Sequence, residues 1–210
     1  MMTENVTPAF IIGNGRSRQG FDLNLLKGNG AVFGCNALYR DLDHDLIDHL
    51  VVIDMAITKE LQESDFPQDK LIVPEIEDQW EPVEYTKIVG GNRKRGNTGM
   101  VCMLEAIKRG HTELYCMGFD FLINDTQESV TNMYDGSDCY GPETRSTFGD
   151  NQNRVKFLEW FAMKNGLVKF NFLFPDKATG MVDRGTKALT FHVVSALNVK
   201  GLFYSQLEFD

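Results

Sequence analysis

Short apolar runs alternate along the chain with segments whose apolar residues recur every three or four positions. Apolar runs of about four to eight residues bounded by glycine or polar residues are typical of buried strands, and the longer spacing is typical of amphipathic helices. The pattern predicts strands at 9–13, 31–35, 48–54, 70–74, 113–121 and 167–175, and helices at 21–28, 56–64, 97–110 and 154–166. This alternation predicts a single doubly wound α/β domain with a mostly parallel, Rossmann-like sheet covered by helices on both faces.

Composition narrows the class of protein. The chain has 210 residues, of which 42% are hydrophobic and 24% charged, and these values are typical of a folded globular protein. This length suits one buried core, so we expect residues 1–210 to form one domain. The formal net charge of -9 argues against a general nucleic-acid binder, because such proteins neutralise phosphates with clustered Lys and Arg. We find no secretory signal and no apolar run of about 18 residues, so we expect no transmembrane segment and a cytoplasmic location.

Two segments fall outside the alternation. Residues 123–153 are polar, rich in Asp, Ser, Asn and Gly, and longer than an ordinary connection, so we expect a mobile lid loop there. Residues 176–210 are expected to form a C-terminal extension. The four cysteines have neither metal-ligand nor redox spacing, which indicates no disulfide framework.

Three turns rich in glycine or asparagine are expected at the carboxyl ends of the strands, where open parallel sheets bind ligands. They are "GNGRS" after the first strand, "GCN" after the second, and "GNRKRGNTG" before the helix at 97–110. A dinucleotide-binding turn needs a third glycine where Arg18 stands, and an acidic residue about 20 positions later. A phosphate loop needs lysine where Asn97 stands. Neither a dinucleotide enzyme nor a nucleoside triphosphatase is therefore indicated.

The residue types in these turns suit a nucleoside phosphate. Gly13 and Gly15 let backbone amides come close to a ligand. Asn14 and Asn36 offer hydrogen-bond donors and acceptors together, which suits a base and ribose. A helix that begins near residues 98–99 presents unpaired amides and a positive dipole end to an anion.

Two charged residues near these turns are further candidates. Asp120 ends the apolar strand "ELYCMGFD", where a carboxylate would face the ligand cleft. Arg95, in the basic run 93–95, precedes the helix at 97–110 and is expected to contact an anionic substrate, with a solvated position as the alternative.

The motifs "IIGNGRS", "GCN", "RGNTG" (95–99) and "GFDF" (118–121), in that order, resemble those of the bacterial cell-surface sialyltransferases that use CMP-sialic acid. The resemblance covers about residues 9–175 and implies a nucleotide-sugar-binding domain, a Rossmann-like variant of the glycosyltransferase-A type. It implies an inverting, metal-independent transfer with no cofactor besides the CMP-sugar donor, to a carbohydrate or glycolipid acceptor. The residues that it implies for nucleotide binding are Gly13, Asn14, Gly15, Ser17, Asn36, Thr98 and Gly99.

The sequence departs from that family at two places. A tyrosine that would bind the departing phosphate is replaced by Leu122, and the nearest tyrosines, Tyr134 and Tyr140, lie in the polar loop and are expected to substitute for it. Asp150 stands where the family has its histidine base, so Asp150 is either the general base or the N-cap of the following helix. His192 is a further candidate base, although its apolar surroundings favour burial.

We therefore expect a sialyltransferase-like glycosyltransferase, with two alternatives open. One is a nucleotide-binding module without catalytic activity. The other is a metal-dependent transferase that binds a nucleotide-diphosphate sugar with residues 93–95 and a metal with Asp41, Asp43 or Asp54, near the acidic run "DLDHDLIDH". That run is otherwise a solvated face. The oligomeric state stays open, with a homo-oligomer as one alternative.

Overall fold

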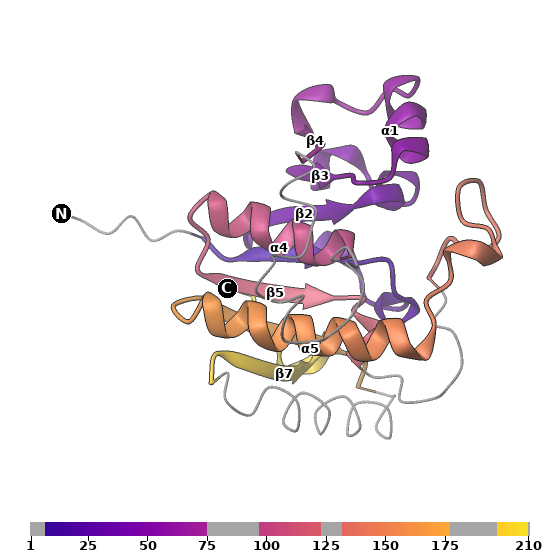
Figure 1. Cartoon of the computed structure of the whole chain (residues 1–210). Helices are drawn as coiled ribbons and strands as arrows, with labels where there is room; N and C mark the ends of the chain where they lie inside the picture. Colours follow the sequence, from indigo (N-terminus) through magenta and orange to yellow (C-terminus); the bar gives the residue numbers. More distant parts are fainter. Residues whose placement is uncertain (1–6, 75–96, 123–131, 177–196, 210) are drawn as a thin grey trace.

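The computed structural model describes residues 7–74, 97–122, 132–176 and 197–209. A seven-stranded sheet forms its centre, in the order β4-β3-β2-β1-β5-β6-β7, and every pair of neighbouring strands is parallel (Figure 1). The strands are β1 (Ala9–Ile12), β2 (Ala31–Cys35), β3 (His49–Val51), β4 (Leu71–Ile72), β5 (Glu113–Met117), β6 (Lys169–Phe174) and β7 (Val199–Phe203). The predicted Rossmann-like α/β fold is confirmed.

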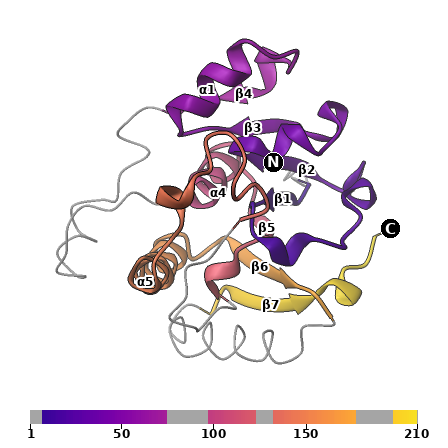
Figure 2. The same ribbon diagram turned by 90° about the vertical axis from the view of Figure 1, so that its right-hand side faces the viewer.

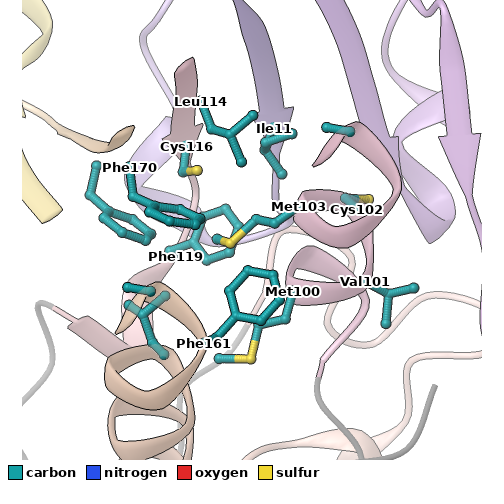
Figure 3. Packing of buried hydrophobic residues seen from close by; sticks show 14 of the residues in the cluster. Ile11, Met100, Val101, Cys102, Met103, Leu114, Cys116, Phe119, Phe161 and Phe170 are labelled. Atoms are coloured by element: carbon teal, nitrogen blue, oxygen red, sulfur yellow. The ribbon is translucent and has the colours of Figure 1, made fainter. Parts of the chain in front are cut away.

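The two faces of the sheet are covered differently. Successive residues of a strand point to opposite faces, and Ile11 belongs to one core cluster while Ile12 belongs to the other. The long helices α4 (Thr98–Lys108) and α5 (Phe148–Lys164) cover the face that contains Ile11 (Figures 1 and 2). Figure 3 shows the sulfur-rich packing of this face, with Met100 and Met103 of α4 near Phe161 of α5. The other face is covered by the short helix α1 (Met55–Gln62), by 3-10 turns and by the C-terminal segment.

The helices begin at side-chain caps. Asn97 caps α4 by accepting a hydrogen bond from the Met100 amide at 3.0 Å. In α5, Thr147 is the N-cap, and its hydroxyl accepts the Asp150 amide while Asp150 accepts the Thr147 amide at 3.0 Å. This capping box starts α5 at Phe148, earlier than the predicted start at residue 154. The interpretation of Asp150 as the N-cap is therefore wrong by three residues, because Asp150 is the third helical residue.

The helix predicted at 21–28 is a single 3-10 turn, η2 (Leu23–Leu26), capped by Asp22. The first turn of an α-helix fixes several dihedral angles for one hydrogen bond, and eight residues ending at Gly28 leave few further bonds to offset that cost. Gly28 has a φ of +80°, which ends the segment.

Parts of the predicted lid and extension are described. Residues 132–147 form turns and the 3-10 turn η7 (Pro142–Thr144), and they contact the first strand turn through the Met133 amide, which donates to the Asn14 carbonyl at 2.8 Å. Residues 123–131 lie outside the described part, so the mobility of the lid stays a prediction. The extension contributes β7, which the pattern of apolar residues did not predict. Among the described helices, none is both long and apolar enough to cross a membrane.

Candidate functional site

The strand order reverses between β1 and β5, which are parallel neighbours at the centre of the sheet. Ligands of open α/β sheets bind outside the carboxyl ends of the strands at such a reversal. The structure has a cavity of about 1130 Å³ at this point, hereafter the cleft. The predicted site residues that border the cleft are Gly13, Asn14, Gly15, Asn36, Thr98, Gly99, Asp120 and Tyr140.

The turns after β1 and β5 meet backbone against backbone. The Gly13 amide donates to the Met117 carbonyl at 2.9 Å, and the Gly15 amide donates to the Gly118 carbonyl at 3.0 Å. Gly118 has a φ of +73°, and a Cβ on it would lie 2.6 Å from the Gly13 oxygen. Only glycine fits this approach, so the predicted glycine turn is held by a second glycine from the neighbouring strand.

Asp120 borders the cleft from the end of β5 and is fixed by the turn after β1. The Ser17 amide donates to Asp120 Oδ2 at 3.1 Å, and the Ser17 hydroxyl donates to Oδ1. Burial raises the pKa of the Asp120 carboxyl, while the Ser17 hydrogen bonds and the Arg16 amide and charge oppose that rise. Ser17 itself does not border the cleft, so its place in the structure is that of a positioning residue for Asp120.

The two predicted asparagines have different surroundings. Asn14 Nδ2 donates to the Cys35 carbonyl at 3.2 Å, which leaves its buried Oδ1 without a hydrogen-bond partner among the described residues. Asn36 adopts a φ of +44°, and its Oδ1 accepts the Ile53 amide at 3.4 Å. An unpaired buried oxygen is costly, so Asn14 is a candidate acceptor for a ligand that binds against this residue.

Tyr140 and Tyr134 are neighbours, but only Tyr140 of the two borders the cleft. Tyr140 borders the cleft, and burial raises the pKa of its hydroxyl to about 12. That hydroxyl makes no hydrogen bond of good geometry to a described residue, although the Asn36 side chain and the Ala37 backbone lie near enough to oppose the rise in pKa. Tyr134 lies behind it at 5.5 Å between ring centroids, where its hydroxyl donates to Asp41 and accepts from the buried Arg18. Tyr134 therefore supports Tyr140 and does not border the cleft.

The beginning of α4 forms another wall. The residues of this wall are Asn97, Thr98 and Gly99. The side chain of Asn97 accepts a hydrogen bond from one first-turn amide, that of Met100. A Cβ on Gly99 would lie 2.7 Å from the Phe119 ring, so glycine brings this helix end close to the β5 turn. The remaining first-turn amides and the positive end of the helix dipole suit an anion.

The beginning of α5 and the turn before it contribute groups that the sequence did not predict. Arg154 and Arg145 border the cleft, whereas Asp150 does not and is held in its capping box. The sequence signal for Arg154 was weak, because a charge on a helix face is usually solvated.

The remaining predicted positions make other contacts where the structure describes them, and one of them also borders the cleft. Asp54 borders it but caps α1, and Asp43 caps a 3-10 turn. Asp41 pairs with Arg18 at 3.1 Å. Within the described residues, no group of three His, Cys, Asp or Glu could hold a metal ion. Arg95 and His192 lie outside the described residues.

A scan against protein-family models matched no family, and searches of curated proteins and of solved structures found no match. The function must therefore be argued from the cleft itself.

Proposed function

We propose that this chain is a cytoplasmic, sialyltransferase-like glycosyltransferase that takes a sugar from a CMP-sugar donor and transfers it to a carbohydrate or glycolipid acceptor. One observation carries the proposal. Asn14 and Tyr140 border the same cavity as the beginning of α4, and each carries a buried oxygen, Oδ1 and Oη, that is not satisfied by a hydrogen bond within the described residues. Neutral polar groups beside a helix N-terminus suit a nucleoside that carries phosphate.

Each wall of the cleft would have its own role in this reaction. Asn14, Asn36 and Tyr140 would bind base and ribose, and the first-turn amides of α4 would bind the phosphate. The charge that develops on a nucleoside monophosphate as it leaves can be stabilised by such amides and by a hydroxyl, which is consistent with a metal-independent, inverting transfer.

Two carboxylates are candidates for the base that takes the proton of the acceptor hydroxyl. Asp120 is favoured by its place in the cleft and by burial, which raises its pKa toward the range useful for a base. Asp150 stands at the position that the resemblance implies. Its Oδ2, however, accepts hydrogen bonds from the amide and the hydroxyl of Thr147, and these bonds stabilise the beginning of α5.

A thermal-shift screen of CMP, CDP, UMP, UDP, GDP and NAD tests the nucleotide. We expect CMP or CDP to raise the melting temperature most, because a ligand that binds only the folded state stabilises it by mass action. Tyr140→Phe should fold normally and weaken CMP binding about tenfold, since it removes one hydroxyl available to the ligand. Equal shifts for all bases, or none at saturating ligand, would contradict the proposal.

Turnover of CMP-sialic acid in Asp120→Asn and Asp150→Asn tests the base. Removing a general base commonly costs about 10²–10⁴-fold in turnover, so we expect that loss in Asp120→Asn and nearly full activity in Asp150→Asn. The reverse pattern would assign the base to Asp150.

A nucleotide-binding module without activity is the second candidate. It is favoured by Leu122, which is buried in the core where the resembling family has a tyrosine, and by the position of Asp150 outside the lining of the cleft. CMP binding without turnover in the unaltered protein would establish this candidate in place of the enzyme.

A further inference from the structure

Arg154 borders the cleft from the second turn of α5 and is half-buried. Its Nη1 donates to Asn151 Oδ1 at 3.0 Å and to the Ser146 hydroxyl. Asn151 is only 3% exposed, so the guanidinium is anchored on one side by a fixed part of the fold. The orientation of the group is therefore determined before any ligand arrives.

The other side of the guanidinium faces no partner in the part of the chain that the structure describes. There, the hydrogen bonds of Arg154 come from Nη1 alone, and no ion pair joins Nε or Nη2 to a described carboxylate. Burial lowers the pKa of Arg154, and Asp150 is the neighbouring charge that opposes this. A half-buried cation paired only with neutral oxygens is costly, and an anion in the cleft would relieve that cost.

Arg145, also at the cleft, shows what the same edge of a guanidinium can bind. Its Nε and Nη2 donate to the two carboxylate oxygens of Asp135 at 2.8 and 2.9 Å. This planar fork matches both carboxylate and phosphate oxygens. The edge that Arg145 uses for Asp135 is the edge that stays open in Arg154.

We infer that the Nε–Nη2 edge of Arg154 is a binding subsite for a carboxylate or phosphate group of the ligand that fills the cleft. This inference rests on the proposed function in assigning a ligand to the cleft and deepens it, because it requires that ligand to be acidic at the α5 end. The acidic group is either the nucleotide phosphate or a carboxylate on the sugar, and the two sources are separable by experiment.

The first test uses anions without a nucleoside. The full chain is titrated with inorganic phosphate and with free N-acetylneuraminic acid at constant ionic strength, with KCl as the reference salt, and its melting temperature is recorded. We expect at least one anion to stabilise the unaltered protein beyond KCl, and Arg154→Gln to lose that response. Lys156→Gln removes the same charge from an exposed position on the same helix and should respond like the unaltered protein.

The second test compares the Kd values of cytidine, CMP and CMP-sialic acid by calorimetry. Losing a charged bidentate contact should weaken the acidic ligand about 10- to 100-fold in Arg154→Gln and leave cytidine unchanged. A loss already seen with CMP identifies the phosphate, and a loss confined to CMP-sialic acid identifies the sugar carboxylate.

The inference is overturned if the unaltered protein shows no anion response beyond KCl, or if Arg154→Gln responds as the unaltered protein does. If the anions bind through Arg154 but no cytidine ligand binds, the subsite stands and the proposed function fails. Should Arg154→Gln not fold, Arg154→Lys keeps the charge without the fork and should lose most of the response. Phosphate should also slow amide exchange across residues 146–154 of the unaltered protein, and unchanged exchange there would count against the subsite.

Discussion

Gly118→Ala tests whether the two glycine turns beneath the cleft need their close backbone contact. Alanine at a φ of +73° costs about 1–2 kcal/mol, because its Cβ approaches its own backbone. The same Cβ would lie 2.6 Å from the Gly13 oxygen and 2.9 Å from the Gly13 carbonyl carbon, and forcing atoms into a packed region costs about 1–3 kcal/mol more. The free energy of unfolding should therefore fall by about 2–5 kcal/mol.

Gly110→Ala is the matched control, because Gly110 precedes the same strand, β5, and has a φ of +90°, while a Cβ added to it would meet no atom within 4 Å in the described part of the chain. It carries the backbone cost alone, about 1–2 kcal/mol, and the effect of alanine on the unfolded chain is common to both variants. For a chain of this size 1 kcal/mol corresponds to about 2–4 °C in melting temperature, so Gly118→Ala should melt about 2–12 °C below Gly110→Ala in thermal unfolding followed by circular dichroism. Equal melting temperatures would refute the reasoning.

Three further predictions concern charge, reactivity and capping. Arg40 holds the pKa of the Glu60 carboxyl below its usual value of 4.5, so the pair stabilises the fold above that pH and is lost as pH falls through the lowered pKa. Glu60→Gln should melt below the unaltered protein at pH 7, with the two curves converging as the pH falls below 4.5, and a constant gap would contradict this. Cys139 is the half-buried thiol of four, so a thiol reagent should modify one cysteine promptly in the native protein and all four after unfolding, and Cys139→Ser should abolish the prompt phase. Asn97→Asp keeps the cap of α4 and should change the free energy of unfolding by no more than about 0.5 kcal/mol. Its charge in the cleft should weaken CMP binding but not cytidine binding. Equal losses for both ligands would show that the beginning of α4 does not hold the phosphate.

The sequence predicted the elements whose apolar runs are continuous. β2 has the predicted bounds, and β1, β5 and α4 lie within theirs, because each is an apolar segment that ends at glycine or polar residues. β7 was missed because "VKGLF" carries a lysine and a glycine, which interrupt the apolar run that would indicate a strand.

The cleft was predictable where its groups follow strands directly. Gly13, Asn36 and Asp120 meet there because the carboxyl ends of parallel strands share one edge. Arg154 was not predictable, since nothing in the pattern of α5 says which part of its surface packs beside the turn after β5. Ser17 and Tyr134 contact residues that border the cleft but do not border it themselves. Whether a residue borders the cleft depends on the direction of its side chain, which residue spacing does not give.

The strand order also determines how the chain can assemble during synthesis. Every pair of neighbours in the sheet is consecutive in the chain except β1 and β5. The strands β1 to β4 can therefore pair as they leave the ribosome. One edge of the buried β1 stays unpaired until β5 has been synthesised and the long connection between β1 and β5 has closed. A nascent chain that stops before residue 113 thus exposes an apolar strand edge, which is a template for aggregation. The pairing of β1 with β5, at the ligand cleft, can therefore form only after the pairings among β1 to β4.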